Sequence, residues 1–228
     1  PEVVDLIMKC TNEIKKFAYG IPTYRIEDGV SLLETPDGEV PLKVFGQHNL
    51  NNLEGARWVC LEMGVQEEEF YEAISTFSGA GKRLELIGEK GNSKIFKDFA
   101  HAPSKVEATV RGTKEQFNSH QVIAVLELHT FSSLTPEFMK GYKGTLEKAD
   151  KAYVYFNPEA VAHKKLPPIS EDVVKEAFGT NDIEVTTDSD WVFRQMKNDF
   201  DENSILLIMT SGNFHGKNLE EEAKFILD

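Results

Sequence analysis

Residues 122–128 read VIAVLEL, a run of apolar side chains that is broken only by Glu127. Residues 205–209 read ILLIM and form a second apolar run without interruption. Strands buried on both faces of a parallel sheet read as continuous apolar runs, whereas half-exposed antiparallel strands alternate with polar residues. These two stretches therefore predict the centre of a parallel sheet that is covered on both faces.

Shorter strand and helix patterns alternate around these two runs. The sequence predicts further strands at 94–99, 152–156 and 183–185, and helices at 105–116, 136–148, 171–178, 191–198 and 219–227. Strands separated by helical segments imply right-handed crossovers. The fold class that this pattern predicts is α/β, with a doubly wound and mostly parallel sheet.

The first eighty residues have a different pattern. Turn signals at 27–29 and 36–38 separate short strand-like runs, which predict a small antiparallel sheet between residues 19 and 44. Helices are expected at 3–17, from about 48 to 64, and at 67–77. The glycine-rich turn at 78–81 is the predicted boundary between a domain at 1–80 and a domain at 81–228.

Composition excludes several classes of protein. The chain has 228 residues, of which 40% are hydrophobic, and its formal net charge is −13. It can form a core, and it lacks the run of about 18 apolar residues that a membrane-spanning helix needs. The negative charge argues against nucleic-acid and membrane partners. A ligand that carries phosphate must therefore be held by a local site.

Three further features of the sequence carry expectations of their own. The sequence begins at Pro1 without methionine, which we interpret as a cut inside a longer protein. Cys10 and Cys60 lack metal-site spacing, which favours a reducing, cytoplasmic location. Residues 79–82 read GAGK, but a Walker A loop needs Ser or Thr after the lysine, where this chain has Arg83. This segment is expected to be a flexible linker.

Residues 48–52 read HNLNN at the start of a predicted helix. One interpretation is an asparagine N-cap with solvated neighbours. The other is that Asn49 and Asn52, three positions apart, project from one face of the first turn. Carboxamides offer a donor and an acceptor together, which suits a purine edge. The residues alone leave both interpretations open.

Three polar loops follow predicted strands, at 98–103 (DFAHAP), 127–130 (ELHT) and 210–216 (TSGNFHG). Ligands of open α/β sheets bind at the carboxyl ends of the strands, so these loops are expected to converge on one edge. Asp98 could accept from ribose hydroxyls or assist a metal, and His101 could contact a phosphate. The alternative is that Asp98 caps a turn and His101 lies on the surface.

The motifs HNxxN at 48–52, KRLE at 82–85 and DFAHxP at 98–103, in this order, resemble the ATP-dependent Mur ligases of peptidoglycan synthesis. The segments IAVLE at 123–127 and IMTSG at 208–212 extend the resemblance over nearly the whole chain. It implies a Rossmann-like C-terminal domain at 81–228, preceded by the tail of the central ATPase domain at 1–80. The P-loop of the family would lie upstream of Pro1.

The resemblance also implies an activity and a set of site residues. The activity is formation of an amide bond between UDP-N-acetylmuramate and a muropeptide or L-alanine through an acyl phosphate, in the bacterial cytoplasm. ATP and Mg²⁺ are implied, with the metal ligands mainly outside this sequence, so the chain alone is expected to be inactive. The implied nucleotide contacts are His48, Asn49, Asn52, Arg83 and Asp98; the catalytic groups are Arg83 and His101; the acceptor-facing residues are His129, Thr130, Ser211, Asn213 and Phe214.

Departures from the family pattern leave the acceptor open. One branch usually carries a second histidine after His101 and a threonine after Pro103, where this chain has Ala102 and Ser104. An arginine is also usual in the loop at 127–130 and is absent here. A second hypothesis, motivated by the missing P-loop, is a non-catalytic Rossmann-like domain that binds small molecules or a partner. A P-loop upstream of Pro1 in the coding sequence would favour the ligase.

Overall fold

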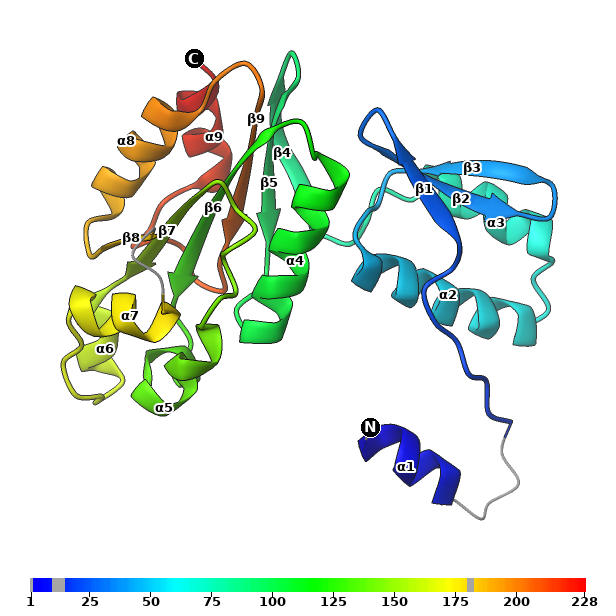
Figure 1. Ribbon diagram of the computed structural model, residues 1–228, viewed down its shortest axis with the longest axis horizontal. Helices are drawn as coiled ribbons and strands as arrows, with labels where there is room; N and C mark the ends of the chain where they lie inside the picture. The colour runs from blue at the N-terminus through cyan, green and yellow to red at the C-terminus, as the bar shows by residue number, and fades with distance from the viewer. Residues whose placement is uncertain (1, 10–14, 180–182) are drawn as a thin grey trace.

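The computed structural model describes residues 2–9, 15–179 and 183–228, which form two sheets with their helices (Figure 1). The smaller sheet has the order β1-β2-β3, and the larger one has the order β4-β5-β9-β6-β7-β8. Within these residues, no helix combines the length and the apolar character that crossing a membrane requires.

The small sheet and two helices form two packed layers. Its antiparallel strands are β1 (Tyr24–Glu27), β2 (Val30–Thr35) and β3 (Gly38–Leu42), as predicted, and it packs on α2 (Gln47–Glu62) and α3 (Glu67–Thr76). Their shared core consists of Leu33, Leu42, Leu50, Leu53 and Phe70.

The helix predicted at 3–17 is shorter than expected. Helix α1 covers Glu2–Lys9, and residues 10–14 lie outside the described part of the chain. Phe17 is not helical; its ring stacks on Trp58 with the ring centroids 4.9 Å apart. The apolar residues between 3 and 17 predict a single helix. Phe17 instead packs on Trp58, which is a tertiary contact that sequence periodicity does not reveal.

The large sheet is doubly wound and mostly parallel, which confirms the predicted fold class. Its strands are β4 (Glu85–Lys90), β5 (Ser93–Asp98), β6 (Gln121–Leu128), β7 (Lys151–Phe156), β8 (Ile183–Thr186) and β9 (Ser204–Met209). The apolar strands β9 and β6 lie side by side near its centre and are parallel. Helices α4 (Pro103–Gln116), α5 (Pro136–Met139) and α7 (Glu171–Phe178) pack on one face, and α8 (Ser189–Asp199) and α9 (Leu219–Leu227) on the other.

In the large sheet and its helices, two elements were missed and one helix was predicted too long. Strand β4 pairs antiparallel with β5 at the sheet edge and is bulged between Leu86 and Gly88, so it lacks a clean alternation. The short helix α6 (Pro158–His163) was also missed. The helix predicted at 136–148 stops after one turn and a 3₁₀ turn, and Gly144 then adopts a φ of +77°. A left-handed glycine ends a helix readily.

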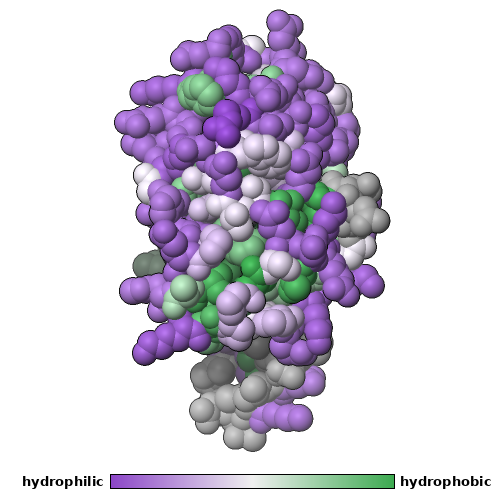
Figure 2. All heavy atoms as spheres, turned by 90° about the vertical axis from the view of Figure 1, so that its left-hand side faces the viewer, coloured by the Kyte–Doolittle hydropathy of each residue, from purple (hydrophilic) through white to green (hydrophobic). Residues whose placement is uncertain are grey.

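The side of the molecule formed by α6, α7 and α8 is mostly hydrophilic, with an apolar area near its centre (Figure 2). Val173 of α7 is among the exposed apolar side chains, and β8 is the last strand of the sheet at this edge. Nothing in the described residues shows what covers this area.

The two sheets are joined by a small set of contacts. The Phe45 ring packs edge-on against Phe96 at 5.3 Å and Phe117 at 5.4 Å between centroids. The Ser31 hydroxyl donates to Gln116 Oε1 at 2.8 Å. These contacts fix how α2 meets α4, and the domain boundary at 78–81 stays a prediction.

Candidate functional site

The three polar loops meet at the carboxyl edge of the large sheet, as expected from the sequence. Strand β9 lies between β5 and β6, so the loops that follow these strands are neighbours. The Thr210 backbone N–H donates to the Asp98 carbonyl at 2.9 Å, and the Thr210 hydroxyl donates to the Glu127 carboxylate. One threonine therefore ties the ends of all three strands together.

Asp98 is buried and fixes the segment that enters the large sheet. Its carboxylate accepts the Leu84 N–H at 2.8 Å and the Ala100 N–H at 2.7 Å. Burial raises the pKa of this carboxyl, while these two hydrogen bonds and the charges of Arg83 and Lys105 act in the opposite direction. Asp98 therefore holds Arg83 beside the end of β5, whatever further role it has.

The first two turns of α2 carry His48, Asn49 and Asn52. The helix begins at Gln47 with Gly46 as its N-cap, so the asparagines are not the cap. The Asn49 amide donates to the Phe45 carbonyl at 2.9 Å, and Asn52 is exposed. The two carboxamides are three positions apart on one helix, as the spacing predicted.

His48 lies in a cluster of positive charge. Burial lowers the pKa of His48, and the charges of Lys105, Arg83 and Arg111 lower it further. Arg111 has Glu115 at 3.8 Å, whereas Arg83 and Lys105 have no ion pair in the part of the chain that the structure describes. Three cations from two parts of the sequence thus surround one half-buried imidazole, in a chain whose net charge is −13.

Two helix N-termini lack a capping side chain near this cluster. Neither Gly46 at α2 nor Ala102 at α4 provides a side-chain hydrogen bond to the first turn. The N-terminus of α2 approaches the C-terminal half of α4, since a Cβ on Gly112 would lie 3.1 Å from the Gly46 Cα. Unpaired N–H groups and the positive end of the helix dipole favour anions, and the cations beside them act in the same direction.

His101 follows Asp98 on the loop before α4. Its Nδ1 lies 2.9 Å from the Phe99 carbonyl, and its ring packs edge-on against Phe99 with centroids 5.1 Å apart. The Tyr142 hydroxyl donates to the His101 carbonyl. These contacts fix the imidazole with its other nitrogen available to a ligand.

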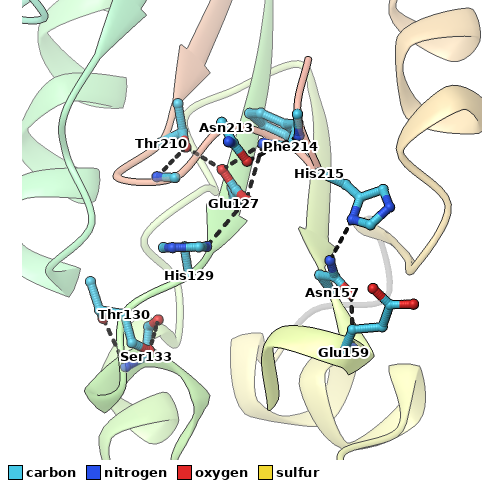
Figure 3. A network of polar contacts seen from close by, with 12 residues as sticks. Glu127, His129, Thr130, Ser133, Asn157, Glu159, Thr210, Asn213, Phe214 and His215 are labelled. Atoms are coloured by element: carbon cyan, nitrogen blue, oxygen red, sulfur yellow. Dashed lines mark hydrogen bonds and ion pairs between the residues drawn. The ribbon is translucent and has the colours of Figure 1, made fainter. Parts of the chain in front are cut away.

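A second polar network lies at the ends of β6 and β9 (Figure 3). The Glu127 side chain is only 2% exposed, and it accepts the Thr210 hydroxyl and the Phe214 N–H, the latter at 3.2 Å. His129 Nδ1 lies 3.6 Å from Glu127 Oε1, and the His129 side chain is 38% exposed. A buried carboxylate therefore faces a histidine that opens to solvent.

The other residues that were predicted to face the acceptor differ in burial and in hydrogen bonding. Thr130 accepts the Ser133 N–H at 3.1 Å, Asn213 is exposed, and the Ser211 hydroxyl is buried without a hydrogen-bond partner among the described residues. The Phe214 ring is fully buried and stacks on Tyr155 with centroids 5.4 Å apart. In this conformation the Phe214 ring belongs to the core, and only its neighbours reach the surface.

Three residues of these networks were not selected from the sequence. Lys105 and Arg111 carried no motif, because their role depends on how α2 meets α4. Glu127 belonged to the polar loop predicted at 127–130 but was given no role, although it is the one charged residue in the apolar run 122–128. Within residues 2–9, 15–179 and 183–228, no group of three His, Cys, Asp or Glu side chains is placed to hold a metal ion.

Comparison with known proteins gives one family. The family model described as "Mur ligase, glutamate ligase domain" matches residues 82–212. A UDP-N-acetylmuramate–L-alanine ligase of Desulfitobacterium hafniense is 33% identical over 51% of this chain and 26% of the relative. One from Carboxydothermus hydrogenoformans is 27% identical over 88% of this chain and 46% of the relative. The chain thus spans less than half the length of these relatives.

Solved structures show the same fold at lower identity. The UDP-N-acetylmuramate-alanine ligase MurC of Thermotoga maritima has a TM-score of 0.66 at 16% identity, covering 94% of this chain and 46% of that one. The MurF ligase of Thermotoga maritima, solved in complex with ADP, has a TM-score of 0.61 at 16% identity and covers 90% and 44%. The murein peptide ligase of Psychrobacter arcticus has a TM-score of 0.56 at 20% identity and covers 90% and 43%.

Proposed function

This chain belongs to the Mur ligase family, and from that premise we propose that it closes the ATP site and binds the acceptor in an ATP-dependent ligase. The observation that carries the proposal is the cluster of Arg83, Lys105 and Arg111 around His48, beside Asp98. The cluster supplies the local positive field that a phosphate ligand needs in a chain of net charge −13.

The proposed roles follow the geometry of the cluster. Arg83 and Lys105 bind the phosphates and stabilise the charge that develops on the transferring phosphoryl group. Asn49 and Asn52 contact the adenine from α2, and Asp98 holds the ribose while it fixes the backbone before Arg83. His101 lies near the phosphates. Arg83 and Lys105 have no ion pair among the described residues, so no ion pair has to break when they bind the phosphates.

The proposed reaction has two steps. A carboxylate oxygen of UDP-N-acetylmuramate attacks the γ-phosphorus of ATP, the bond to the bridging oxygen breaks, and ADP leaves. The acceptor amine then attacks the acyl carbon of the resulting acyl phosphate and releases inorganic phosphate. Both substrates are cytoplasmic metabolites, so the proposed location is the bacterial cytoplasm.

The proposed division of the chain is residues 1–80 as the tail of the central ATP-binding domain and residues 81–228 as the C-terminal domain. The chain spans less than half of its relatives, which leaves room for a P-loop and for magnesium ligands elsewhere in the whole protein. The ADP complex of the MurF ligase with the same fold supports ATP as the nucleotide.

For the acceptor we propose an amino acid or short peptide with a free amine. The sequence motifs favour the branch that joins UDP-N-acetylmuramate to the tripeptide L-alanyl-γ-D-glutamyl-meso-diaminopimelate. The relatives cited above are named L-alanine ligases, which favours alanine. The loop at 127–130 lacks an arginine that could bind a substrate carboxylate through two hydrogen bonds. The two acceptors must therefore be tested against each other.

The test is an assay of the full-length protein that contains this chain. ADP release is measured with ATP and UDP-N-acetylmuramate, and either L-alanine or the tripeptide is added. We expect release that depends on one acceptor, with the amide product detected by mass spectrometry. The control omits UDP-N-acetylmuramate. Absence of ADP release with both acceptors would contradict the proposed activity.

A further inference from the structure

The network of Glu127 and His129 is not needed for the phosphate chemistry proposed above, and it lies on the loops that would face the acceptor. Glu127 is held rigidly, since its two carboxylate oxygens accept from Thr210 and from the Phe214 backbone. His129 Nδ1 faces Glu127 at 3.6 Å, and the imidazole is partly open to solvent. The buried group is therefore fixed, and the exposed group is oriented by it (Figure 3).

The loop after β9 closes the other side of this pair. A Cβ on Gly212 would lie 2.6 Å from His129 Cγ and 2.7 Å from both carboxylate oxygens of Glu127. The loop then continues through Phe214 and His215, which both have positive φ values of 46° and 61°. Such backbone costs free energy and persists where the surroundings determine it, often at functional sites.

We propose that His129, oriented by Glu127, is the general base that removes a proton from the acceptor ammonium. This inference rests on the proposed ligase function. A carboxylate that faces Nδ1 keeps the proton on that nitrogen, leaves the lone pair on Nε2 and stabilises the imidazolium that forms. The 3.6 Å separation is longer than a hydrogen bond, and such contacts often shorten when the substrate binds.

The proton balance of the second step requires such a group. An ammonium has no lone pair, so His129 Nε2 takes one proton before the nitrogen can attack. The N–C bond then forms, the bond between the acyl carbon and the phosphate oxygen breaks, and the second proton leaves with the phosphate. The imidazolium returns its proton to water. No oxidant, reductant or further reactant is involved.

Two neighbouring groups are poorer candidates for this role. Glu127 from β6 is the carboxylate that faces His129, and its charge also acts on Tyr155 from β7. Burial and the Glu127 charge raise the pKa of Tyr155 to about 12, so its hydroxyl stays protonated at neutral pH. His101 has a carbonyl partner in place of a carboxylate and belongs to the loop before α4.

The test separates the second step from the first in the full-length protein. Hydroxylamine is uncharged at neutral pH, so it attacks an acyl phosphate without a general base and gives a hydroxamate. We expect His129→Gln to lower kcat with the amino-acid or peptide acceptor by about 100-fold or more. Hydroxamate formation should keep the wild-type rate. Added imidazole should restore part of the lost activity with the acceptor.

Two further variants complete the experiment. Glu127→Gln can present its amide N–H to His129 and fix the wrong tautomer, so it should also slow amide formation and spare hydroxamate formation. His120→Gln changes the histidine that precedes the same strand and should leave both rates unchanged. Melting temperatures check that each variant is folded.

The outcomes distinguish the two proposals. Equal loss of amide and hydroxamate in His129→Gln would overturn the general base, and so would full retention of amide formation. Absence of both ADP and hydroxamate in the wild-type protein would instead contradict the ligase function itself.

Discussion

His48 shows how single side chains build a site against the overall charge. The chain carries a net charge of −13, yet three cations act on His48, namely Arg83 before β4 and Lys105 and Arg111 on α4. Coulomb interactions between partly buried groups are screened less than those on the surface. A few cations around a half-buried group therefore determine the field that a bound phosphate would experience.

The lowered pKa of His48 predicts a change in the pH dependence of stability. Below pH about 6.5, the unfolded chain binds a proton at His48 more readily than the folded chain does. The free energy of unfolding therefore decreases as the pH is lowered. We expect His48→Gln to reduce this fall below pH about 6.5, measured by urea denaturation. The exposed His163→Gln is the control. Identical slopes for His48→Gln and the wild type would contradict the prediction.

Arg83 predicts an effect on activity rather than on stability. Its side chain is exposed and has no ion pair in the described residues, so its removal breaks no ion pair of the folded chain. In the full-length protein, we expect Arg83→Ala to lower ATP-dependent turnover tenfold or more, which is about 1.4 kcal/mol of transition-state stabilisation. Arg194→Ala changes an exposed arginine on α8 and should have no effect. Wild-type kinetics in Arg83→Ala would remove this residue from the site.

At the scale of the elements, the loop after β9 packs tightly on the end of β6. Gly212 lies there against Glu127 and His129. An alanine there would bring its Cβ within 2.7 Å of the Glu127 carboxylate, so the loops after β6 and β9 must move apart. We expect Gly212→Ala to lower the free energy of unfolding by about 1–3 kcal/mol. It should also slow amide formation more than hydroxamate formation. Gly20→Ala, with no atom within 4 Å of the added Cβ, is the matched control. Wild-type stability in Gly212→Ala would show that the loops are not locked.

The elements that sequence predicted well are those with one dominant physical cause. Strands β6 and β9 are mostly apolar because helices cover both faces of the sheet. Helices α7 and α9 match their predicted bounds because their ends carry strong signals. Ser170 and Asn218 cap these helices with side-chain hydrogen bonds. Strand β4 escaped prediction because an edge strand with a bulge keeps neither alternation nor continuous burial.

The candidate site was predictable only in part, for a related reason. Sequence order placed three loops after strands, and the strand order of the sheet then made them neighbours. The cations on α4 and the burial of the Phe214 ring depend on packing between elements far apart in the chain. Sequence motifs and hydrophobic periodicity describe residues that are close along the chain. Contacts between residues far apart in the sequence are visible only in the structure.

For the chain as a whole, the two sheets meet over a limited area. Contacts gather at Phe45 and Gly46, whereas a cavity of about 950 Å³ lies between the sheets on the side of Phe117 and His120. The connection between the two parts runs through residues 78–83, where Gly79 and Lys82 both have positive φ values. The Leu84 N–H, just after this connection, donates to the Asp98 carboxylate at 2.8 Å and ties it to the large sheet.

This arrangement predicts weak nucleotide binding by the 228-residue chain alone. Its sequence has no Walker A loop, so the phosphates would be held only by Arg83, Lys105, Arg111 and two helix N-termini. The remaining charge of the chain repels ATP. We expect calorimetry to give a dissociation constant of about 1 mM or weaker, equivalent to about −4 kcal/mol or less favourable binding. The full-length protein should bind at least tenfold more tightly. Micromolar affinity for the isolated chain would contradict this, because it would mean that the phosphate site is complete without a P-loop.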